Sequence, residues 1–265
     1  MEGKYYSSER SVQMLISLLK QHDIKKCVLS PGTTNLTLVA SLQHDPYFEL
    51  YSSVDERSAA YIACGMAAES GEPVVLSCTG ATASRNYLPG LTEAYYRKLP
   101  VLAVTSTQDE VRIGHLRPQV IDRNSLQNDI ALLSEHVPET HNATTEWSNM
   151  IKINRALLEL RHRGGGPVHL NLQTTYSRDY SVKELPEVRM IRRICVGDEF
   201  PNMPKGRVAV FIGAHRKFTE EETATLDAFC GTYDAVVLGD HTSGYKGKYF
   251  VQASLLVSQD KGMDD

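Results

Sequence analysis

The sequence has no apolar run long enough to cross a membrane and no dense cluster of basic residues. Its apolar stretches fall short of the roughly 18 residues that a membrane span requires. No run of five or more basic residues is present, and the formal net charge is −4. The short apolar stretches argue against a membrane protein. The negative net charge and the missing basic run argue against a nucleic-acid-binding protein.

Signals for export and for disulfide bonds are also missing. The amino terminus, residues 1–5, lacks the apolar core of a signal peptide. The five cysteines are odd in number and have no paired spacing, and several lie within apolar strand or helix patterns. We therefore expect reduced core thiols in a cytoplasmic protein, with a catalytic cysteine as the weaker alternative.

Short apolar runs alternate with helical patterns through the first two thirds of the chain. Runs without polar interruption are typical of parallel strands that are buried on both faces. The expected strands are 26–29, 49–54, 73–78, 100–105 and 168–172, with helices between them. This alternation predicts an α/β fold, a doubly wound parallel sheet with helices on both faces.

A second unit follows a charged, proline-containing stretch. The apolar run 207–213 predicts a strand, and Thr219 with Glu222 forms a capping-box signature for a helix that ends near Gly231. A further strand is expected at 234–240, but a piece this small buries too little surface to be stable alone. We therefore expect a first domain over 1–178, a linker over 179–204 and an incomplete Rossmann-like α/β domain over 205–265.

Glu56 lies at the start of a helix of small residues. The segment 54–68 opens with Asp55 and Glu56 and continues with small or apolar residues at helical spacing. A carboxylate in the first turn is favoured by the helix dipole. Glu56 is therefore either an amino-terminal cap or a carboxylate held against a ligand.

Four motifs occur in order along the chain and together resemble a known domain. They are Ser30-Pro31-Gly32, Val54-Asp55-Glu56-Arg57-Ser58-Ala59, Cys78-Thr79-Gly80 with Asn86, Pro89 and Glu93-Ala94-Tyr95-Tyr96, and Gly166-Pro167-Val168-His169-Leu170-Asn171. Over about residues 8–175 the chain resembles the pyrimidine-binding domain of thiamine-diphosphate-dependent enzymes. Within that superfamily it is most similar to the menaquinone-pathway synthases that join 2-oxoglutarate to isochorismate. Residues 205–265 are similar to the start of the central domain.

The resemblance implies a catalytic role for Glu56. In these enzymes the equivalent carboxylate hydrogen-bonds a ring nitrogen of the cofactor's aminopyrimidine and so promotes removal of the thiazolium C2 proton. The activated cofactor then decarboxylates a 2-oxo acid and passes the product to an acceptor or a proton. The resemblance assigns further residues to the cofactor pocket, namely Pro31, Gly32, Thr79, Gly80 and Asn86.

Three residues are implied on the substrate side: Thr33, His115 and Gln119. For His115 and Gln119 a solvated loop side chain without a role remains the alternative. The synthases carry a serine-arginine pair where this chain has Thr33-Thr34, which removes a bidentate carboxylate-binding fork. This departure favours a related decarboxylase or carboligase that uses another acceptor.

The magnesium-anchoring motif of the family, Gly-Asp-Gly followed by a later asparagine, is absent. Only Gly197-Asp198-Glu199 and Gly239-Asp240-His241 come near it, and neither has the second glycine. We therefore assign no metal ligand to this chain. Thiamine diphosphate and Mg²⁺ are expected to need a diphosphate-binding domain, supplied by missing sequence or by a separate subunit.

Active sites of the family lie between subunits, so the resemblance implies at least a homodimer. Its interface is expected to bury the helix surface around Tyr61, Tyr87 and Tyr95. Three hypotheses stay open: a fragment of a lyase or transferase, a natural subunit of a split 2-oxo acid decarboxylase, and a non-catalytic binding or regulatory module. The extra β-α-β piece, which ends abruptly in residues 260–265, favours the fragment over a natural split.

Overall fold

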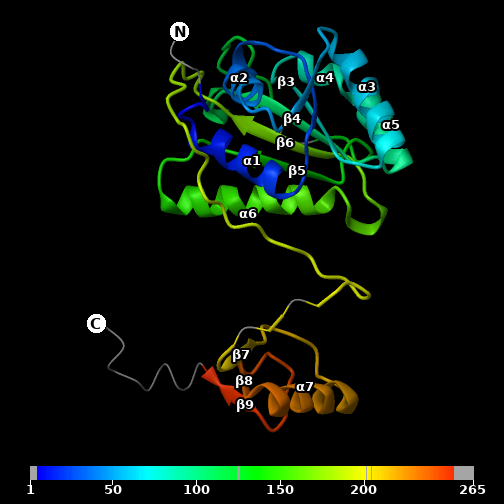
Figure 1. Ribbon diagram of the computed structural model, residues 1–265, viewed down its shortest axis with the longest axis vertical. Helices are drawn as coiled ribbons and strands as arrows, with labels where there is room; N and C mark the ends of the chain where they lie inside the picture. The colour runs from blue at the N-terminus through cyan, green and yellow to red at the C-terminus, as the bar shows by residue number, and fades with distance from the viewer. Residues whose placement is uncertain (1–4, 124–125, 201, 204, 254–265) are drawn as a thin grey trace. The chain divides into compact units, whose positions relative to one another are not determined.

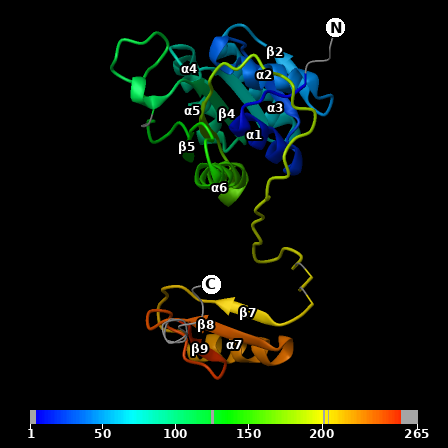
Figure 2. The same cartoon turned by 90° about the vertical axis from the view of Figure 1, so that its left-hand side faces the viewer.

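The computed structural model describes residues 5–123, 126–200, 202–203 and 205–253. The start of the chain and its end at 260–265, on which the expectations about export and truncation rest, lie outside the described residues. The chain divides into two compact units, Met1–Arg193 and Ile194–Asp265, each with its own sheet (Figures 1 and 2).

A six-stranded sheet forms the centre of the first unit. Its order is β2-β1-β3-β4-β6-β5, and every pairing is parallel. Its inner strands are almost entirely buried, as their uninterrupted apolar sequences require. The strands are β1 (Lys26–Leu29), β2 (Glu49–Ser52), β3 (Val74–Thr79), β4 (Val101–Thr107), β5 (Leu133–Val137) and β6 (Val168–Gln173).

Helices cover both faces of this sheet. In Figure 1, α1 and α6 lie together on one face, and α3 and α5 lie together on the other. The helices are α1 (Arg10–Gln21), α2 (Leu36–His44), α3 (Glu56–Ser70), α4 (Ala83–Asn86), α5 (Leu88–Arg97) and α6 (Ala143–Glu159), with short 3₁₀ turns at Thr33–Asn35, Glu110–Arg112 and His162–Gly164. The predicted doubly wound parallel α/β fold is confirmed.

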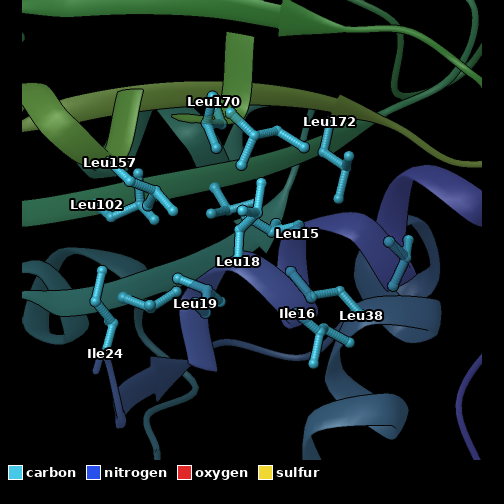
Figure 3. Close-up of a cluster of buried hydrophobic side chains, with 14 of the residues drawn as sticks. Leu15, Ile16, Leu18, Leu19, Ile24, Leu38, Leu102, Leu157, Leu170 and Leu172 are labelled. Carbon is cyan, nitrogen blue, oxygen red and sulfur yellow. The ribbon is translucent and has the colours of Figure 1, made fainter. Parts of the chain in front are cut away.

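Alternate residues of the same strands face two separate hydrophobic cores. Leu102 and Leu170 point into the core beneath α1 and α6, whereas Leu76 and Ala103 point into the core beneath α3 and α5. Figure 3 shows side chains of α1 packed against leucines of the sheet in the first of these cores. The sheet is therefore a shared wall between two apolar layers.

The carboxyl ends of β1 and β3 bring two of the sequence motifs side by side. The strands are neighbours in the sheet, with Leu29 opposite Ser77. The loop that begins at Ser30 therefore leaves the sheet beside the end of β3 at Thr79. Ligands of doubly wound folds bind at this edge, where successive strand connections diverge.

The second unit contains a smaller parallel sheet of order β7-β8-β9. The capping box formed by Thr219 and Glu222 opens its helix, as the sequence predicts. The elements are β7 (Val208–Phe211), α7 (Glu220–Tyr233), β8 (Ala235–Gly239) and β9 (Phe250–Gln252). Its buried apolar cluster is small, centred on Val237 and Tyr245, as expected for an incomplete Rossmann-like domain.

The segment after residue 178 follows the surface of the first unit before the second unit begins. Val182 pairs with Tyr6 in an antiparallel bridge. The carbonyl oxygens of Pro186 and Val188 accept hydrogen bonds from Ser17 and Gln21 of α1. The first part of the expected linker is thus held against α1 by backbone contacts.

One part of the expected oligomer surface is wrong. The Tyr87 side chain is fully buried inside the first unit, between α5 and the sheet, so no partner is needed to cover it. Tyr61 stays 45% exposed and Tyr95 is partly exposed. Of these three tyrosines, Tyr61 and Tyr95 are accessible to a partner subunit and Tyr87 is not.

The five cysteines all carry free thiols, four of them buried and Cys195 exposed. In the described ranges no helix combines the length and the apolar character that a membrane crossing requires.

Candidate active site

Asp55, not Glu56, caps the helix that follows. Asp55 Oδ1 accepts a hydrogen bond from the Ser58 backbone N–H at 2.7 Å, which is the standard N-cap contact. The side chain and the backbone N–H of Ser58, in that order, lower the pKa of the Asp55 carboxyl. Because the capping position is already filled, the interpretation of Glu56 as a cap is wrong and its carboxylate is free for another contact.

The Glu56 carboxylate contacts Asn86 of α4. Asn86 Nδ2 donates to Glu56 Oε2 at 3.0 Å, which joins two residues that the sequence assigns to one site. Within the described chain no protein group hydrogen-bonds Oε1. Glu56 is partly buried, and its charge reaches the core: burial raises the pKa of the Cys78 thiol to about 12, and the Glu56 carboxylate adds to that rise.

Gly32 packs directly against Thr79. A Cβ at Gly32 would overlap the Thr79 methyl group, so only glycine fits this approach. Asn35 fixes the loop: its Oδ1 accepts from the Gly32 N–H at 2.7 Å, and its Nδ2 donates to the Ser30 carbonyl at 3.2 Å. Two candidate cofactor residues, Gly32 and Thr79, are therefore in contact.

Thr34 ties the same loop to Gly80. The Thr34 hydroxyl donates to the Ser106 carbonyl at 2.9 Å and accepts from the Gly80 N–H at 3.3 Å. Thr34 is 1% exposed. The Thr34 hydroxyl thus joins the loop to the Gly80 turn inside the protein and is closed to solvent.

The candidate substrate residues are exposed loop residues. Thr33 is exposed at the start of the first 3₁₀ turn, and Pro31 is exposed beside it. His115 and Gln119 are exposed on the long connection between β4 and β5. No hydrogen bond in the described chain joins either of them to the Glu56–Asn86 pair. Gln119 has a left-handed backbone with φ 61°, which is uncommon for a residue with a side chain.

A buried polar cluster that the sequence analysis missed lies beside Gly80. The Arg123 guanidinium hydrogen-bonds the Gly80 carbonyl and Asn171 Oδ1, and it is almost completely buried. Asn171 Nδ2 contacts Glu110 Oε1 at 3.5 Å, and His136 Nδ1 lies 3.2 Å from the same oxygen. The sequence signal was weak: Asn171 interrupts an apolar strand, and Arg123 follows no motif.

The near matches to the metal-anchoring motif use their carboxylates locally. Asp198 accepts from the Cys195 N–H, and Asp240 accepts from the N–H and hydroxyl of Thr242. Over the described residues no group of three or more histidine, cysteine or acidic side chains gathers in a geometry that could hold a metal ion.

The arrangement can accept a hydrogen bond from a ligand. Glu56 offers one carboxylate oxygen with no protein partner, while Asn86 restrains the other oxygen. The contact of Gly32 with the Thr79 side chain lies at the carboxyl ends of the adjoining strands. A flat heterocycle with a ring N–H would find an aimed acceptor here.

Comparison with known proteins shows what the chain is similar to. Residues 10–134, which include Glu56 and Asn86, match the family described as thiamine pyrophosphate enzyme, N-terminal TPP binding domain. The 2-succinyl-5-enolpyruvyl-6-hydroxy-3-cyclohexene-1-carboxylate synthase of Bacteroides thetaiotaomicron is 36% identical over 189 residues, which cover 71% of this chain and 34% of that enzyme. The enzyme of the same name from Flavobacterium johnsoniae is 27% identical over 252 residues, covering 91% of this chain and 45% of that enzyme.

A solved structure shares the fold. Benzoylformate decarboxylase from Polynucleobacter necessarius superposes with a TM-score of 0.55 at 17% identity, over 91% of this chain and 46% of that one. The chain spans less than half the length of the relatives named here. Over residues 10–134 the chain therefore belongs to the thiamine pyrophosphate enzyme family, of which it contains the N-terminal TPP binding domain.

Proposed function

We propose that the chain supplies the pyrimidine-activating half of a thiamine-diphosphate-dependent lyase or transferase that acts on a 2-oxo acid. The observation that carries this proposal is the contact of Asn86 with Glu56, which leaves one carboxylate oxygen unpartnered in the matched domain. A 2-oxo acid is the substrate class that the resemblance to thiamine-diphosphate-dependent enzymes implies. Bound thiamine diphosphate supplies the carbon nucleophile and electron sink for cleavage next to the carbonyl.

Glu56 is the proton-holding residue in this proposal. Its unpartnered Oε1 accepts a hydrogen bond from a ring N–H of the aminopyrimidine, while Asn86 fixes the plane of the carboxylate. In this proposal Gly32, Gly80 and Thr79 line the bound aminopyrimidine, with the exposed Pro31 beside them. Preorganised contacts of this kind are effective because the side chains need no rearrangement during the reaction.

The diphosphate and Mg²⁺ are held elsewhere in this proposal. The carboxylates of Asp198 and Asp240 are committed to local turns, and the full magnesium motif is absent from the sequence. The proposal places the metal ligands on a diphosphate-binding domain, encoded either in the same reading frame or in a second polypeptide.

The substrate differs from that of the named synthases. Thr34 occupies the position of their arginine and has both hydroxyl hydrogen bonds inside the protein. It has no cationic fork to offer a carboxylate. The proposal is therefore decarboxylation, with or without ligation to an acceptor other than isochorismate, and with Thr33, His115 and Gln119 on the substrate side.

We further propose that α3 and α5 face a second copy of the chain. Their outer surfaces expose Tyr61 and Ile62 by 45% and 44%, and Tyr96 by 69%. Large exposed apolar side chains gathered on one face are typical of protein–protein contacts. The outcome to expect is a dimer or a higher oligomer.

A reducing compartment, the cytoplasm, fits the cysteines. Each of the five is a free thiol, and burial raises the pKa of Cys27, Cys64, Cys78 and Cys230. Thiols with raised pKa values are poor nucleophiles, so these four fit structural roles.

The central experiment substitutes Glu56→Gln in the protein assembled with a diphosphate-binding domain. Thiamine-diphosphate-dependent decarboxylation of a panel of 2-oxo acids is measured, with Glu69→Gln as the matched control because Glu69 is exposed at the far end of the same helix. We expect a loss of about 100-fold or more in kcat for Glu56→Gln only. Unchanged turnover in Glu56→Gln would overturn the proposal.

Sequencing the gene beyond codon 265 separates the forms of the proposal. A continuing frame with the magnesium motif indicates one polypeptide, and a separate frame that carries the motif indicates a split enzyme. Failure to bind thiamine diphosphate with any such domain would instead indicate a non-catalytic module.

A further inference from the structure

Arg123 is a buried cation whose hydrogen-bond partners are both neutral. It is 3% exposed and donates to the Gly80 carbonyl and to Asn171 Oδ1. Among the described residues no carboxylate forms an ion pair with it. Burial lowers the pKa of Arg123 to about 10, with opposing support from the negative charge of Glu110. A buried charge is tolerated only where its hydrogen bonds are satisfied by fixed partners.

Glu110 balances this charge through Asn171. The amide of Asn171 accepts from Arg123 at its oxygen, and its nitrogen lies 3.5 Å from Glu110 Oε1. Glu110 is itself partly buried, and burial raises its pKa. The chain of contacts therefore runs from the Gly80 carbonyl through Arg123 and Asn171 to Glu110.

Gly80 lies in close contact with the Arg123 guanidinium. A Cβ at Gly80 would overlap the Arg123 guanidinium and the Ser106 carbonyl. Since the φ of Gly80 is not in the left-handed region, glycine is required here for close approach rather than for backbone conformation. The absence of a side chain at Gly80 thus leaves the space that the Arg123 guanidinium occupies.

Arg123 belongs to the connection between β4 and β5, which also carries His115 and Gln119. Residues 114–119 of this connection are exposed. On the same connection, the carbonyl of Asp122 accepts a hydrogen bond from the exposed Arg85 at 2.8 Å. Arg123 is therefore the buried polar anchor at the end of the exposed stretch.

We propose that Arg123 is a positioning residue: it pins the substrate-side connection to the Gly80 turn, so that the cofactor wall and the loop bearing Gln119 are ordered together. The functional part of this inference rests on the proposed thiamine-dependent site. Arginine suits the role because its planar fork donates in two fixed directions, toward Gly80 and toward Asn171, whereas a lysine ammonium offers no such geometry.

Hydrogen exchange on the 265-residue chain tests the pin without any cofactor. Arg123→Ala is compared with Arg117→Ala, an exposed arginine of the same connection. We expect exchange at 79–84 and 109–122 to accelerate by about tenfold or more in Arg123→Ala only, since a charge-assisted hydrogen bond is lost at each end. Methylguanidinium should restore the protection, whereas KCl at equal ionic strength should not.

Arg123→Gln and Arg123→Lys keep the test decisive. Arg123→Gln removes the charge with little loss of volume, and Arg123→Lys keeps the charge but loses the fork; both should show intermediate protection at 79–84. Unchanged local exchange in a folded Arg123→Ala would overturn the proposal, and so would global unfolding of every Arg123 variant, which would indicate a purely structural residue.

A kinetic arm separates this proposal from the function it rests on. In the assembled protein, Arg123→Lys should raise the KM for the 2-oxo acid more than it lowers kcat, because the loop is misplaced while Glu56 is intact. If exchange responds to Arg123 but Glu56→Gln leaves turnover unchanged, the pin stands and the thiamine assignment fails. If Arg123→Lys lowers kcat and leaves the KM unchanged, the positioning role would be overturned.

Discussion

The backbone of Gly90 in α5 lies directly against Ala60 of α3: a Cβ at Gly90 would come within 2.5 Å of the Ala60 Cβ. The thiol of Cys64 on the same helix donates to the Gly90 carbonyl at 3.2 Å. This close crossing fixes α3, and therefore the Glu56 that begins it, against the helix that follows Asn86.

Gly90→Ala should therefore destabilise the first unit although alanine favours helices. We expect a loss of about 1–3 kcal/mol in the free energy of unfolding, because the added methyl overpacks the contact with Ala60. Gly65→Ala in α3 is the matched control, since nothing lies within 4 Å of its Cβ position, and it should stabilise by about 0.5–1 kcal/mol. Urea unfolding followed by circular dichroism measures both, and equal effects would contradict the packing argument.

Asn86 should control how Glu56 works rather than whether the chain folds. Asn86→Ala removes the 3.0 Å hydrogen bond to Glu56 and should lower kcat/KM of the assembled enzyme by about tenfold. Asn86→Asp should cost more, because it sets a second carboxylate against the first. Asn202→Asp, an exposed change in the second unit, serves as the control; a response equal to that of Asn86→Asp would refute the specific contact.

Adjacent threonines should respond very differently to loss of the hydroxyl. Thr34→Val leaves the Gly80 N–H and the Ser106 carbonyl without their shared partner and should cost about 1–3 kcal/mol of stability. Thr33→Val at the neighbouring exposed position should change stability by no more than about 0.5 kcal/mol. Thermal unfolding distinguishes the two, and similar melting temperatures for both variants would show that Thr34 is no brace.

His169 should make the first unit sensitive to acid. Burial, with Arg123 nearby, lowers its pKa from 6.5 to about 3, and its ring nitrogens contact the hydroxyls of Thr105 and Ser134 at 2.7 and 2.8 Å. As pH falls below 6.5 the unfolded chain takes up a proton that the folded chain refuses until about pH 3. Stability should therefore fall by up to about 1.4 kcal/mol per pH unit across that window from this residue alone.

The variant His169→Gln should lose that one-proton slope, whatever its absolute stability. His141→Gln, whose side chain is 63% exposed, should keep it. Unfolding free energies measured from pH 7 to 4 provide the slopes, and an unchanged slope in His169→Gln would mean that another group carries the acid sensitivity.

The sequence was sufficient for the sheet where burial alone decides the structure. The strand expected at 73–78 is β3 (Val74–Thr79), because both of its faces are apolar and buried. β5 escaped notice because Ser134, Glu135 and His136 give an edge strand no apolar pattern. Tyr87 was wrongly expected at the oligomer surface because tyrosine occurs on both buried and exposed faces of helices. Only the tertiary packing places its ring in the core.

The site could be predicted where a local motif fixes it. Glu56 and Asn86 were assigned together and are in contact. The cap could not be resolved, since Asp55 and Glu56 are adjacent carboxylates and only the backbone geometry at Asp55 favours one of them. Arg123 could not be found from the sequence, because its partners Gly80, directly after β3, and Asn171, in β6, are distant in the sequence and leave no spacing signal.

The division of the sheet into two apolar layers separates the packing of α1 and α6 from the proposed site. Glu56 and Tyr87 belong to the α3 and α5 side, while α1 and α6 pack on the opposite side around residues such as Leu15 and Leu157. A designer can therefore raise thermal tolerance by repacking the α1–α6 layer and leave the chemistry untouched. Natural drift is free to do the same, so the two sides of this domain are able to diverge at different rates.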